Sequence, residues 1–433
     1  MIIAHLTYDT RSLLACSLTC YSWYIAAVLH LHRTLITATY CWERNRKFLW
    51  PKPLRYMHEL GLLPLVKEFQ LQIHDPVGFD VFSPELFNHH TLRQFSALAN
   101  VQELGICHLD IHKFMPKIRR YFGHFLPTVR SLALREPRGS CRQILYFIGL
   151  FQHLDDLNLF GGAFGSQEGP KSDLTLVPPF TPPLRGQLTM KCFGNVGFFK
   201  DMIDLFGGIR FRYMDLFLVE GMWLLLDSCT ETLEILRLYP NDFRGEEASL
   251  DDTWVPADDL SASFSLGDID LSQNKSLRAL EVAASSVLGG KLNFLTHALS
   301  TITSPAFSEV VIFYRDYNFR GVGSMQSRSP RTFRAMSKDE VEKEALQHHM
   351  QFELFREMHR MRGFQLVLCA DVWDRMVKYT VGVLKRAVAA EKAKGGFDGH
   401  FSEPLVVYTP RRSPPEFSEI VLADYPNHAV SAI

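Results

Sequence analysis

The chain has 433 residues, of which 47% are hydrophobic and 21% are charged, and its formal net charge at pH 7 is −1. This composition is typical of a folded protein and excludes intrinsic disorder over most of the length. The balanced charge gives no overall electrostatic footprint for nucleic acid or an anionic membrane surface. No apolar run approaches the roughly 18 residues that predict a membrane span. We therefore expect neither nucleic acid nor membrane as a partner.

The two predicted helices closest to the N-terminus are short. Asp9 and Thr10 can cap the start of the first, in which Leu14 and Leu18 lie four residues apart on one apolar face. The second is expected from about Ser22 to Leu31. Helices of this length are not stable alone, so we expect the pair to pack together or on a partner.

An apolar pattern recurs along the rest of the chain: an apolar residue, two others, an apolar residue, one other, an apolar residue. Its alternating part predicts a short strand, and helical patterns lie between the copies. Helices are expected at Ile111–Phe125, Cys141–Phe151, Phe198–Phe206, Gly221–Asp227 and Leu288–Ile302. The copies of the pattern are Val66-Phe69-Leu71, Val101-Leu104-Ile106, Val129-Leu132-Leu134, Leu154-Leu157-Leu159, Leu184 with Leu188-Met190, Tyr213-Leu216-Leu218, Leu233-Leu236-Leu238, Leu277-Leu280-Val282, Phe307-Val310-Ile312 and Gly363-Leu366-Leu368.

The spacing of these copies is close to the roughly 20–29 residue period of leucine-rich repeats. The predicted fold class is therefore α/β, an irregular leucine-rich-repeat solenoid with parallel strands that follows the short helical segment. The repeat is irregular because its usual Asn position is met clearly by Asn241 alone. The alternative is a two-layer α/β domain whose strands happen to be rich in leucine.

The predicted organisation has four parts. Residues 1–37 form the helical segment, and 38–61 form a linker helix. Residues 62–410 form the repeat-like domain, which ends with helices at Ser337–Arg362 and Asp371–Lys394 and a short strand at Leu405–Tyr408. Loop insertions at 241–270 and 315–337 interrupt this domain. Residues 411–433 form a tail.

The helical segment carries a motif. Residues Ser12–Trp23 have the sequence S-L-L-A-C-S-L-T-C-Y-S-W, and Leu31-x-Arg33-x-Leu35 follows. This resembles the second half of an F-box, and most closely that of fungal F-box-like proteins with a divergent leucine-rich region. The resemblance covers about the first 36 residues by motif. An F-box normally opens with Leu-Pro and an acidic residue, whereas this sequence starts at Met1, inside the first helix. The resemblance therefore implies either a truncated form or weak adaptor binding.

The resemblance implies a substrate receptor of an SCF-type cullin ubiquitin ligase. Its helices would dock on a Skp-family adaptor and through it on a cullin, and its repeats would hold an unknown target protein. Position in the motif assigns adaptor binding to Leu13, Leu14, Leu18 and Trp23, although residues of these types are more often part of a domain core than of an interface. Other subunits carry out the ubiquitin transfer, so the chain is expected to be no enzyme and to need no cofactor.

Two alternatives remain open: a leucine-rich-repeat scaffold without a ubiquitin-ligase role, and an enzyme with its site in a loop insertion. Metal binding is not favoured, because His89-His90 and His348-His349 lack the spacing of a metal site. The loop arginines Arg320, Arg328 and Arg331 are candidates for target contact, with a solvated loop as the alternative.

The eight cysteines contain no C-x-x-C pair and no disulfide framework. We expect Cys16 and Cys20 to be small core residues. Because no secretory signal pattern is present either, the sequence predicts a reduced intracellular protein of the cytoplasm or nucleus.

Overall fold

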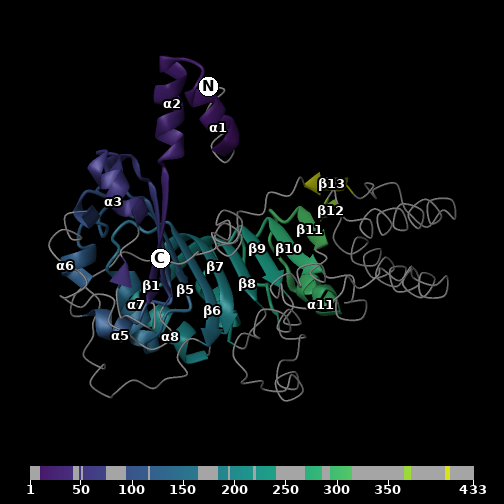
Figure 1. Ribbon diagram of the computed structural model, residues 1–433. Coiled ribbons are helices and arrows are strands. Elements are labelled where there is room, and N and C mark those ends of the chain that lie inside the picture. Colours follow the sequence, from purple (N-terminus) through teal and green to yellow (C-terminus); the bar gives the residue numbers. More distant parts are fainter. Residues whose placement is uncertain are drawn as a thin grey trace, which may run out of the picture. The chain divides into compact units, whose positions relative to one another are not determined.

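A computed structural model describes residues 10–41, 48–49, 52–74, 94–115, 118–163, 184–193, 196–217, 221–239, 269–284, 293–314, 365–371 and 405–409 (Figure 1). The chain divides into two compact units. The first unit is Met1–Arg237 with Gln273–Leu277, and the second is Leu238–Ser272 with Arg278–Ile433. Each unit is considered by itself below.

The first unit begins with the expected pair of helices, α1 (Thr10–Ser17) and α2 (Tyr21–Leu31). The second helix starts one residue earlier than predicted. The two helices share a small core of Leu13, Cys16 and Ala27, against which Ala26 and Leu31 pack. The predicted start at Thr10 is confirmed, while Asp9 lies outside the described residues.

The first unit is built around an open, mostly parallel sheet. Its strands are β1 (Thr34–Cys41), β2 (Phe48–Leu49), β3 (Glu68–His74), β4 (Glu103–Cys107), β5 (Ser131–Arg135), β6 (Asp156–Ala163), β7 (Leu184–Phe193), β8 (Ile209–Phe217) and the part of β9 (Ile235–Tyr239) that ends at Arg237. From β3 onward each strand lies beside the next one in the chain, and β1 lies between β2 and β3. The β1–β2 pair is antiparallel, and the pairs from β1–β3 to β7–β8 are parallel. The predicted α/β class with parallel strands is therefore confirmed.

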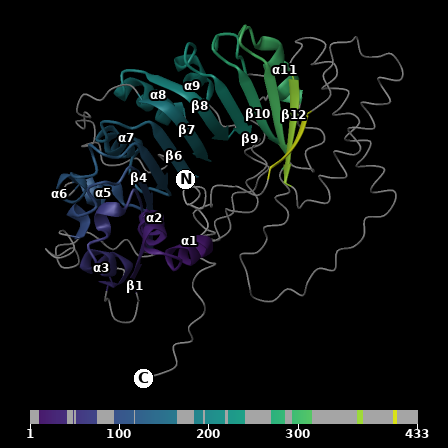
Figure 2. The same cartoon turned by 90° about the horizontal axis from the view of Figure 1, so that it is seen from above.

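Helices connect successive strands of this sheet. They are α3 (Lys52–Glu59), α5 (Ile111–Phe114), α6 (Ile118–Phe122), α7 (Cys141–Gly149), α8 (Val196–Leu205) and α9 (Trp223–Ser228). Figure 2 shows α5, α7, α8 and α9 along one side of strands β4 to β8, and α5 contacts α7, α7 contacts α8, and α8 contacts α9. A layer of neighbouring helices therefore covers one face of the sheet. We call the opposite face of β4 to β9 the open face, since the described residues place none of these helices on it.

The strands place alternate side chains on the two faces. In β5, Leu132 and Leu134 are buried, whereas the side chains between and beside them are only half-buried. The strand register aligns the leucines of successive strands in two buried rows under the helices. One row is Leu104, Leu132, Leu157, Leu188 and Met214, and the other is Ile106, Leu134, Leu159, Met190 and Leu216.

One predicted copy of the pattern is out of register. Tyr213-Leu216-Leu218 was expected, but Met214 is the residue that aligns with Leu188 of the preceding strand. The buried triple is therefore Phe211, Met214 and Leu216, and Tyr213 is only half-buried on the open face. Both triples satisfy the same spacing and share Leu216, so the sequence pattern did not distinguish them; Leu218 lies outside the described residues.

The linker helix predicted for residues 38–61 is wrong over its first part. Strand β1 continues to Cys41 and β2 follows, and the helix α3 occupies Lys52–Glu59 alone. The sequence Thr34-Leu-Ile-Thr-Ala-Thr-Tyr is rich in β-branched residues, which favour a strand. Strand β1 pairs along Thr34 to Tyr40 with β3, so the sheet begins within the segment assigned to the F-box-like helices.

Three neighbouring strands share an unusual backbone conformation at one level of the sheet. His108 directly follows β4, Glu136 directly follows β5, and Gly161 lies within β6 where its register with β7 shifts; their φ angles are 57°, 48° and 79°. The His108 amide donates to the Arg135 carbonyl, and the Glu136 amide donates to the Phe160 carbonyl. His108 Nδ1 lies 3.0 Å from Glu136 Oε2, and the hydrogen bond from His108 lowers the pKa of the Glu136 carboxyl. Neighbouring strands are thus joined at these positions as well as along their ladders.

Aromatic side chains fill the space between β3 and the helices α5 to α7. Phe122 is fully buried, and its ring centroid lies 5.0 Å from that of Phe114 and 5.3 Å from that of Phe125. Phe95 and Phe147 complete its surroundings at 6.3 and 6.5 Å. These rings meet mainly edge to face or tilted, which is the favourable geometry for aromatic pairs.

His124 lies at the edge of this cluster, with its ring 3.9 Å from that of Phe125. Burial lowers its pKa to about 4, against the opposing effect of a hydrogen bond with the Phe95 backbone. Because the unfolded chain has the ordinary, higher pKa near 6.5, it takes up the proton first as the pH falls. We expect about 3 kcal/mol of stability to be lost between pH 6.5 and pH 4 through this group.

Urea unfolding of the intact chain and of His124→Gln over this pH range checks that expectation. The variant should lose less stability than the unaltered chain as the pH falls. His153→Gln, at an exposed position, is the control and should follow the unaltered chain. Parallel pH profiles for the chain and His124→Gln would show that this histidine does not control acid stability.

The second unit repeats the strand arrangement. Its strands are β10 (Ala279–Ala284), β11 (Glu309–Tyr314), β12 (Gln365–Asp371) and β13 (Leu405–Thr409), which pair in parallel in chain order. The helix α11 (Asn293–Thr301) lies between β10 and β11 in sequence. The predicted strand at Leu405–Tyr408 is confirmed. The expected helices at Ser337–Arg362 and after Asp371, the insertion 315–337 and the tail lie outside the described residues, as does the insertion 241–270 up to residue 268.

Candidate docking surface

The residues assigned to adaptor binding do not share one environment. Leu13 is buried between α1 and α2, whereas Leu14 is 51% exposed and Leu18 is 88% exposed. Trp23 on α2 is also exposed. Three of the four residues are therefore available to a partner, and Leu13 supports them from within.

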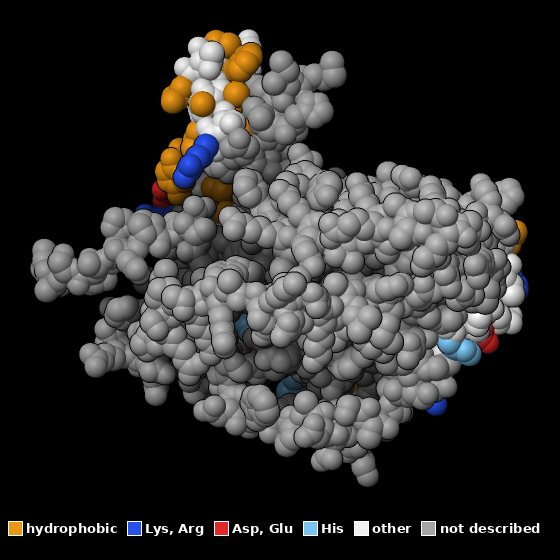
Figure 3. Space-filling model, turned by 90° about the vertical axis from the view of Figure 1, so that its right-hand side faces the viewer, with side chains coloured by type: hydrophobic (Ala, Val, Ile, Leu, Met, Phe, Trp, Pro, Cys, Tyr) orange, Lys and Arg blue, Asp and Glu red, His pale blue; other side chains and the backbone are white. Residues whose placement is uncertain are grey.

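The helix α2 carries further exposed apolar side chains that the motif did not mark. Tyr21, Ile25 and Leu29 follow one another at intervals of four residues on α2, and all three are exposed. Residues four apart lie on the same face of a helix. The sequence signal was present, since nearly every residue of α2 is apolar while one face suffices to pack against α1. We call Leu14, Leu18, Tyr21, Trp23, Tyr24, Ile25 and Leu29 the apolar surface of the helix pair; Figure 3 shows hydrophobic side chains gathered there.

Two hydroxyl groups end α1 and shape the turn to α2. Ser17 Oγ donates to the Leu14 carbonyl at 2.7 Å, and Thr19 Oγ1 donates to the Ala15 carbonyl at 3.1 Å. Cys20 then adopts an extended conformation before the first turn of α2. It is exposed, so the prediction of a core position is correct for Cys16 and wrong for Cys20. The short turn brings the two helices together and leaves Leu18 in solvent.

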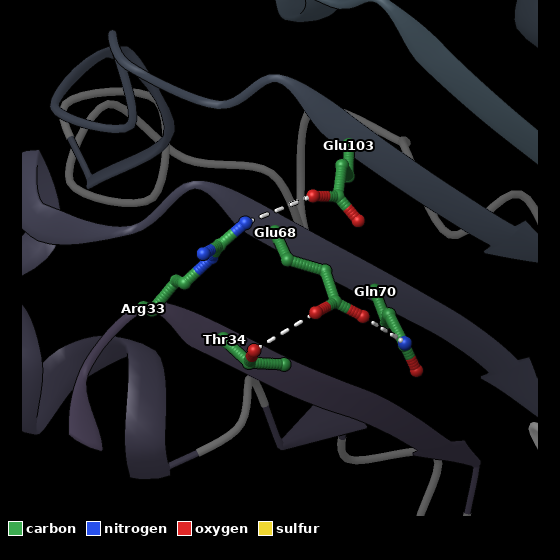
Figure 4. A network of polar contacts seen from close by, with 5 residues as sticks. All are labelled: Arg33, Thr34, Glu68, Gln70 and Glu103. Carbon is green, nitrogen blue, oxygen red and sulfur yellow. Dashed lines mark hydrogen bonds and ion pairs between the residues drawn. The ribbon is translucent and has the colours of Figure 1, made fainter. Parts of the chain in front are cut away.

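The helix pair is joined to the sheet at Arg33, which directly precedes β1 and is separated from α2 by His32. The Arg33 carbonyl accepts hydrogen bonds from the amides of Lys67 and Glu68. Its guanidinium reaches across β3 to Glu103 of β4, with Nη2 3.3 Å from Oε1 (Figure 4). This anchoring fixes the end of α2 relative to the first strands.

Polar side chains on the open face reinforce the same corner. Thr34 Oγ1 donates to Glu68 Oε2 at 2.8 Å, and Gln70 Nε2 donates to Glu68 Oε1 at 2.6 Å (Figure 4). The carboxylate of Glu68 is thus bound by groups on its own strand and on β1. Because its hydrogen bonds are made within the protein, this corner supports the helix pair and is not itself a site for a ligand.

The described residues give no sign of an activated nucleophile at three of the cysteines, of which Cys107 and Cys229 are buried and Cys141 is half-buried. Burial raises the pKa of the thiols of Cys107, Cys141 and Cys229 to about 11. These thiols are protonated at neutral pH, and a thiol in that state is a poor nucleophile.

Several features considered in the sequence fall outside the described residues. They include Arg320, Arg328 and Arg331, the proposed target contacts, and the two pairs of neighbouring histidines. Within the described part of the chain, no group of three or more His, Cys, Asp or Glu side chains is placed to hold a metal ion. The helices described there include none long and apolar enough to cross a membrane.

Comparison with known proteins finds no family model that matches the chain and no curated protein that matches it. Function must therefore be inferred from the motif, the apolar surface of the helix pair and the geometry of the sheet.

Proposed function

We propose that this protein is a substrate receptor of an SCF-type cullin ubiquitin ligase. The apolar surface of the helix pair docks a Skp-family adaptor, which links the protein to a cullin. The strands and helices that follow form an irregular leucine-rich-repeat solenoid, which holds a target protein. The protein acts in the cytoplasm or nucleus, carries no cofactor and contributes proximity, while other subunits transfer the ubiquitin.

The observation that carries this proposal is the exposure of Leu14, Leu18 and Trp23 at the positions that the F-box resemblance assigns to adaptor binding. Clustered apolar side chains in solvent are unfavourable for an isolated protein, and such surfaces commonly mark a binding site. The neighbouring Tyr21, Ile25 and Leu29 enlarge the surface. Aromatic and large aliphatic anchors of this kind often dominate the binding energy of an interface.

The repeat part of the proposal is supported by the arrangement of the first unit. Its strands from β3 onward are neighbours in chain order. The helices α5, α7, α8 and α9 lie side by side on one face (Figure 2). A doubly wound domain would instead cover both faces of its sheet, whereas stacked repeats leave one face open for a partner.

Co-purification with a co-expressed Skp-family adaptor tests the proposal. We expect a stable complex with the intact chain and at least a tenfold loss of affinity, about 1.4 kcal/mol, for Leu14→Asp, because the new carboxylate would be buried in an apolar interface. The matched control is Leu60→Asp after α3, since Leu60 is also 51% exposed but lies outside the helix pair. That variant should bind as the intact chain does.

Two results would contradict this function. One is the absence of any complex between the intact chain and the adaptor, which would favour a repeat scaffold without a ubiquitin-ligase role. The other is equal loss of binding in Leu14→Asp and Leu60→Asp, which would show that the helix pair is not the docking surface.

A further inference from the structure

A cluster of charged side chains lies on the open face of β7, β8 and β9. The carboxylate of Asp215 on β8 lies 4.0 Å from Lys191 Nζ on β7 and 3.8 Å from Arg237 Nη1 on β9. The Asp215 side chain is 8% exposed, while those of Lys191 and Arg237 are 27% and 25% exposed. One buried carboxylate thus lies between two cations that are each about one quarter exposed.

The position of Arg237 is also fixed by an aromatic ring. Its guanidinium carbon lies 5.7 Å from the centroid of the Tyr213 ring, the distance of a cation–π contact. Tyr213 and Asp215 alternate with the buried Met214 on β8, so both lie on the open face. Because the ring and the carboxylate both orient Arg237, little side-chain entropy remains to be lost when an anion binds there.

Three more arginines extend the positive charge toward the start of these strands. Arg185 of β7 and Arg210 of β8 are partners in the strand register, opposite the buried side of the sheet. Arg212 lies beside them and pairs with Glu234 at 2.7 Å. Arg185 approaches Asp155 to 3.9 Å, although Asp155 is nearer to Arg130, at 3.0 Å. We call Arg185, Lys191, Arg210, Arg212 and Arg237 the basic face; Asp155, Asp215 and Glu234 lie within ion-pair distance of its members.

The other end of the open face is not basic. Around β3 and β4 the charges of Glu68 and Glu103 are balanced by Lys67 and Arg33. Burial, and to a lesser extent the nearby Asp155 and Glu103, raises the pKa of the Asp156 carboxyl, so these three acids lie close together beside β4 and β6. The positive charge is therefore concentrated over β7 to β9, although the chain as a whole has a net charge of −1.

We infer that the basic face binds an acidic, Asp- and Glu-rich segment of the target protein. This deepens the proposed function, on which it rests for the presence of a target, by naming the chemistry of what the receptor holds. Carboxylates bound by Lys and Arg form charge-assisted hydrogen bonds, which are the stronger kind in proteins. Neighbouring strands are about 4.8 Å apart, so Lys191 and Arg237 stand on strands about 10 Å apart, a span that a few extended peptide residues cross.

A peptide fits this surface better than a nucleic acid. Asp215 and Glu234 lie among the cations, where they would repel a continuous phosphate backbone. A peptide can place separate carboxylates on the cations and leave neutral residues near these acids. Tyr213 already contacts Arg237, so its ring is not free to stack on a base.

Fluorescence anisotropy with the full chain tests the inference. The probes are a labelled peptide rich in Asp and Glu, a matched peptide with Asn and Gln, and a single-stranded RNA of similar charge. We expect the acidic peptide to bind most tightly and to lose affinity as salt is added. Arg237→Gln and Lys191→Gln should each weaken its binding about tenfold, which corresponds to about 1.4 kcal/mol.

Two further variants keep the test decisive. Arg210→Gln replaces an exposed residue that is distant from the buried Asp215, so it should weaken binding without altering thermal unfolding. Lys200→Gln removes a charge from the exposed side of α8 in the helix layer, and its binding should be unchanged. Thermal unfolding of each variant separates lost binding from lost folding.

Equal binding of the acidic and neutral peptides, tighter binding of the RNA, or the same loss in Lys200→Gln as in Arg210→Gln would each overturn the inference. The adaptor complex is measured separately. If it forms while the acidic peptide fails to bind, the proposed function stands and this inference falls. If the peptide binds as expected but no adaptor complex forms, the chain is a scaffold for acidic segments and the proposed function falls.

Discussion

Gly186→Ala is expected to destabilise the first unit by about 3 kcal/mol or more. Gly186 has a φ of +85°, and a Cβ atom added there would lie 1.9 Å from the Asp155 carbonyl oxygen. The residue sits at a bulge, where the register between β7 and β8 shifts. A left-handed backbone costs a residue with a side chain roughly 1–2 kcal/mol, and overpacking adds roughly 1–3 kcal/mol. The clash is with the backbone of a neighbouring strand, so no side chain can turn away to relieve it.

Gly207→Ala is the matched control. Gly207 also has a positive φ, +59°, but a Cβ atom added there meets nothing within 4 Å. Its substitution should cost only the free energy of placing a residue with a side chain in a left-handed backbone, about 1 kcal/mol. Urea unfolding followed by circular dichroism measures both variants. Equal losses in the two variants would show that the contact with Asp155 relaxes without cost, so that the bulge does not depend on glycine.

Phe122→Ala is expected to cost about 3–5 kcal/mol, the usual range for removing a buried aromatic ring. Phe122 is fully buried, and its ring lies among those of Phe95, Phe114, Phe125 and Phe147. Removing it leaves a cavity, because its neighbours come from different elements that cannot all collapse inward. The edge-to-face contacts with Phe114 and Phe125 are lost as well.

Phe122→Leu separates loss of volume from loss of the ring. Leucine retains most of the apolar contact, so we expect a smaller loss, about 1.5 kcal/mol. Urea unfolding at neutral pH gives the loss of stability in both variants. The circular dichroism spectrum of the folded state shows whether the aromatic cluster still forms. A loss below about 1 kcal/mol for Phe122→Ala would mean that the neighbouring rings repack, and that the cluster is not a fixed core.

Much of the fold could be predicted from local patterns. The alternation around Leu132 and Leu134 is a period of two, which a strand with one buried face requires. The helical patterns predicted α7, α8 and α9 close to their observed bounds. Prediction failed at Tyr213, where two triples fit the same spacing, and at β1, where β-branched residues outweighed the expected linker helix. Local patterns identify an element, but pairing with a neighbour fixes its register.

The candidate site was predictable only in part. The motif marked Leu14, Leu18 and Trp23, which are exposed, together with Leu13, which is buried. A motif records which residue types occur and not which side faces the partner helix, so it did not separate these roles. The exposed Tyr21, Ile25 and Leu29 carried a signal in the uniformly apolar sequence of α2, yet that pattern also fits a fully buried helix.

The sequence by itself determined the α/β class, the order of strands and helices, and the leucines that form the core, because each depends on residues close together in the chain. The tertiary structure alone decided which side chains meet across the open face. Lys191, Asp215 and Arg237 come from three strands separated by helices and turns, and the sequence between them contains nothing that fixes their distances. Parallel pairing of the strands brings them together, because residues at matching register positions become neighbours whatever the length of the connection between them.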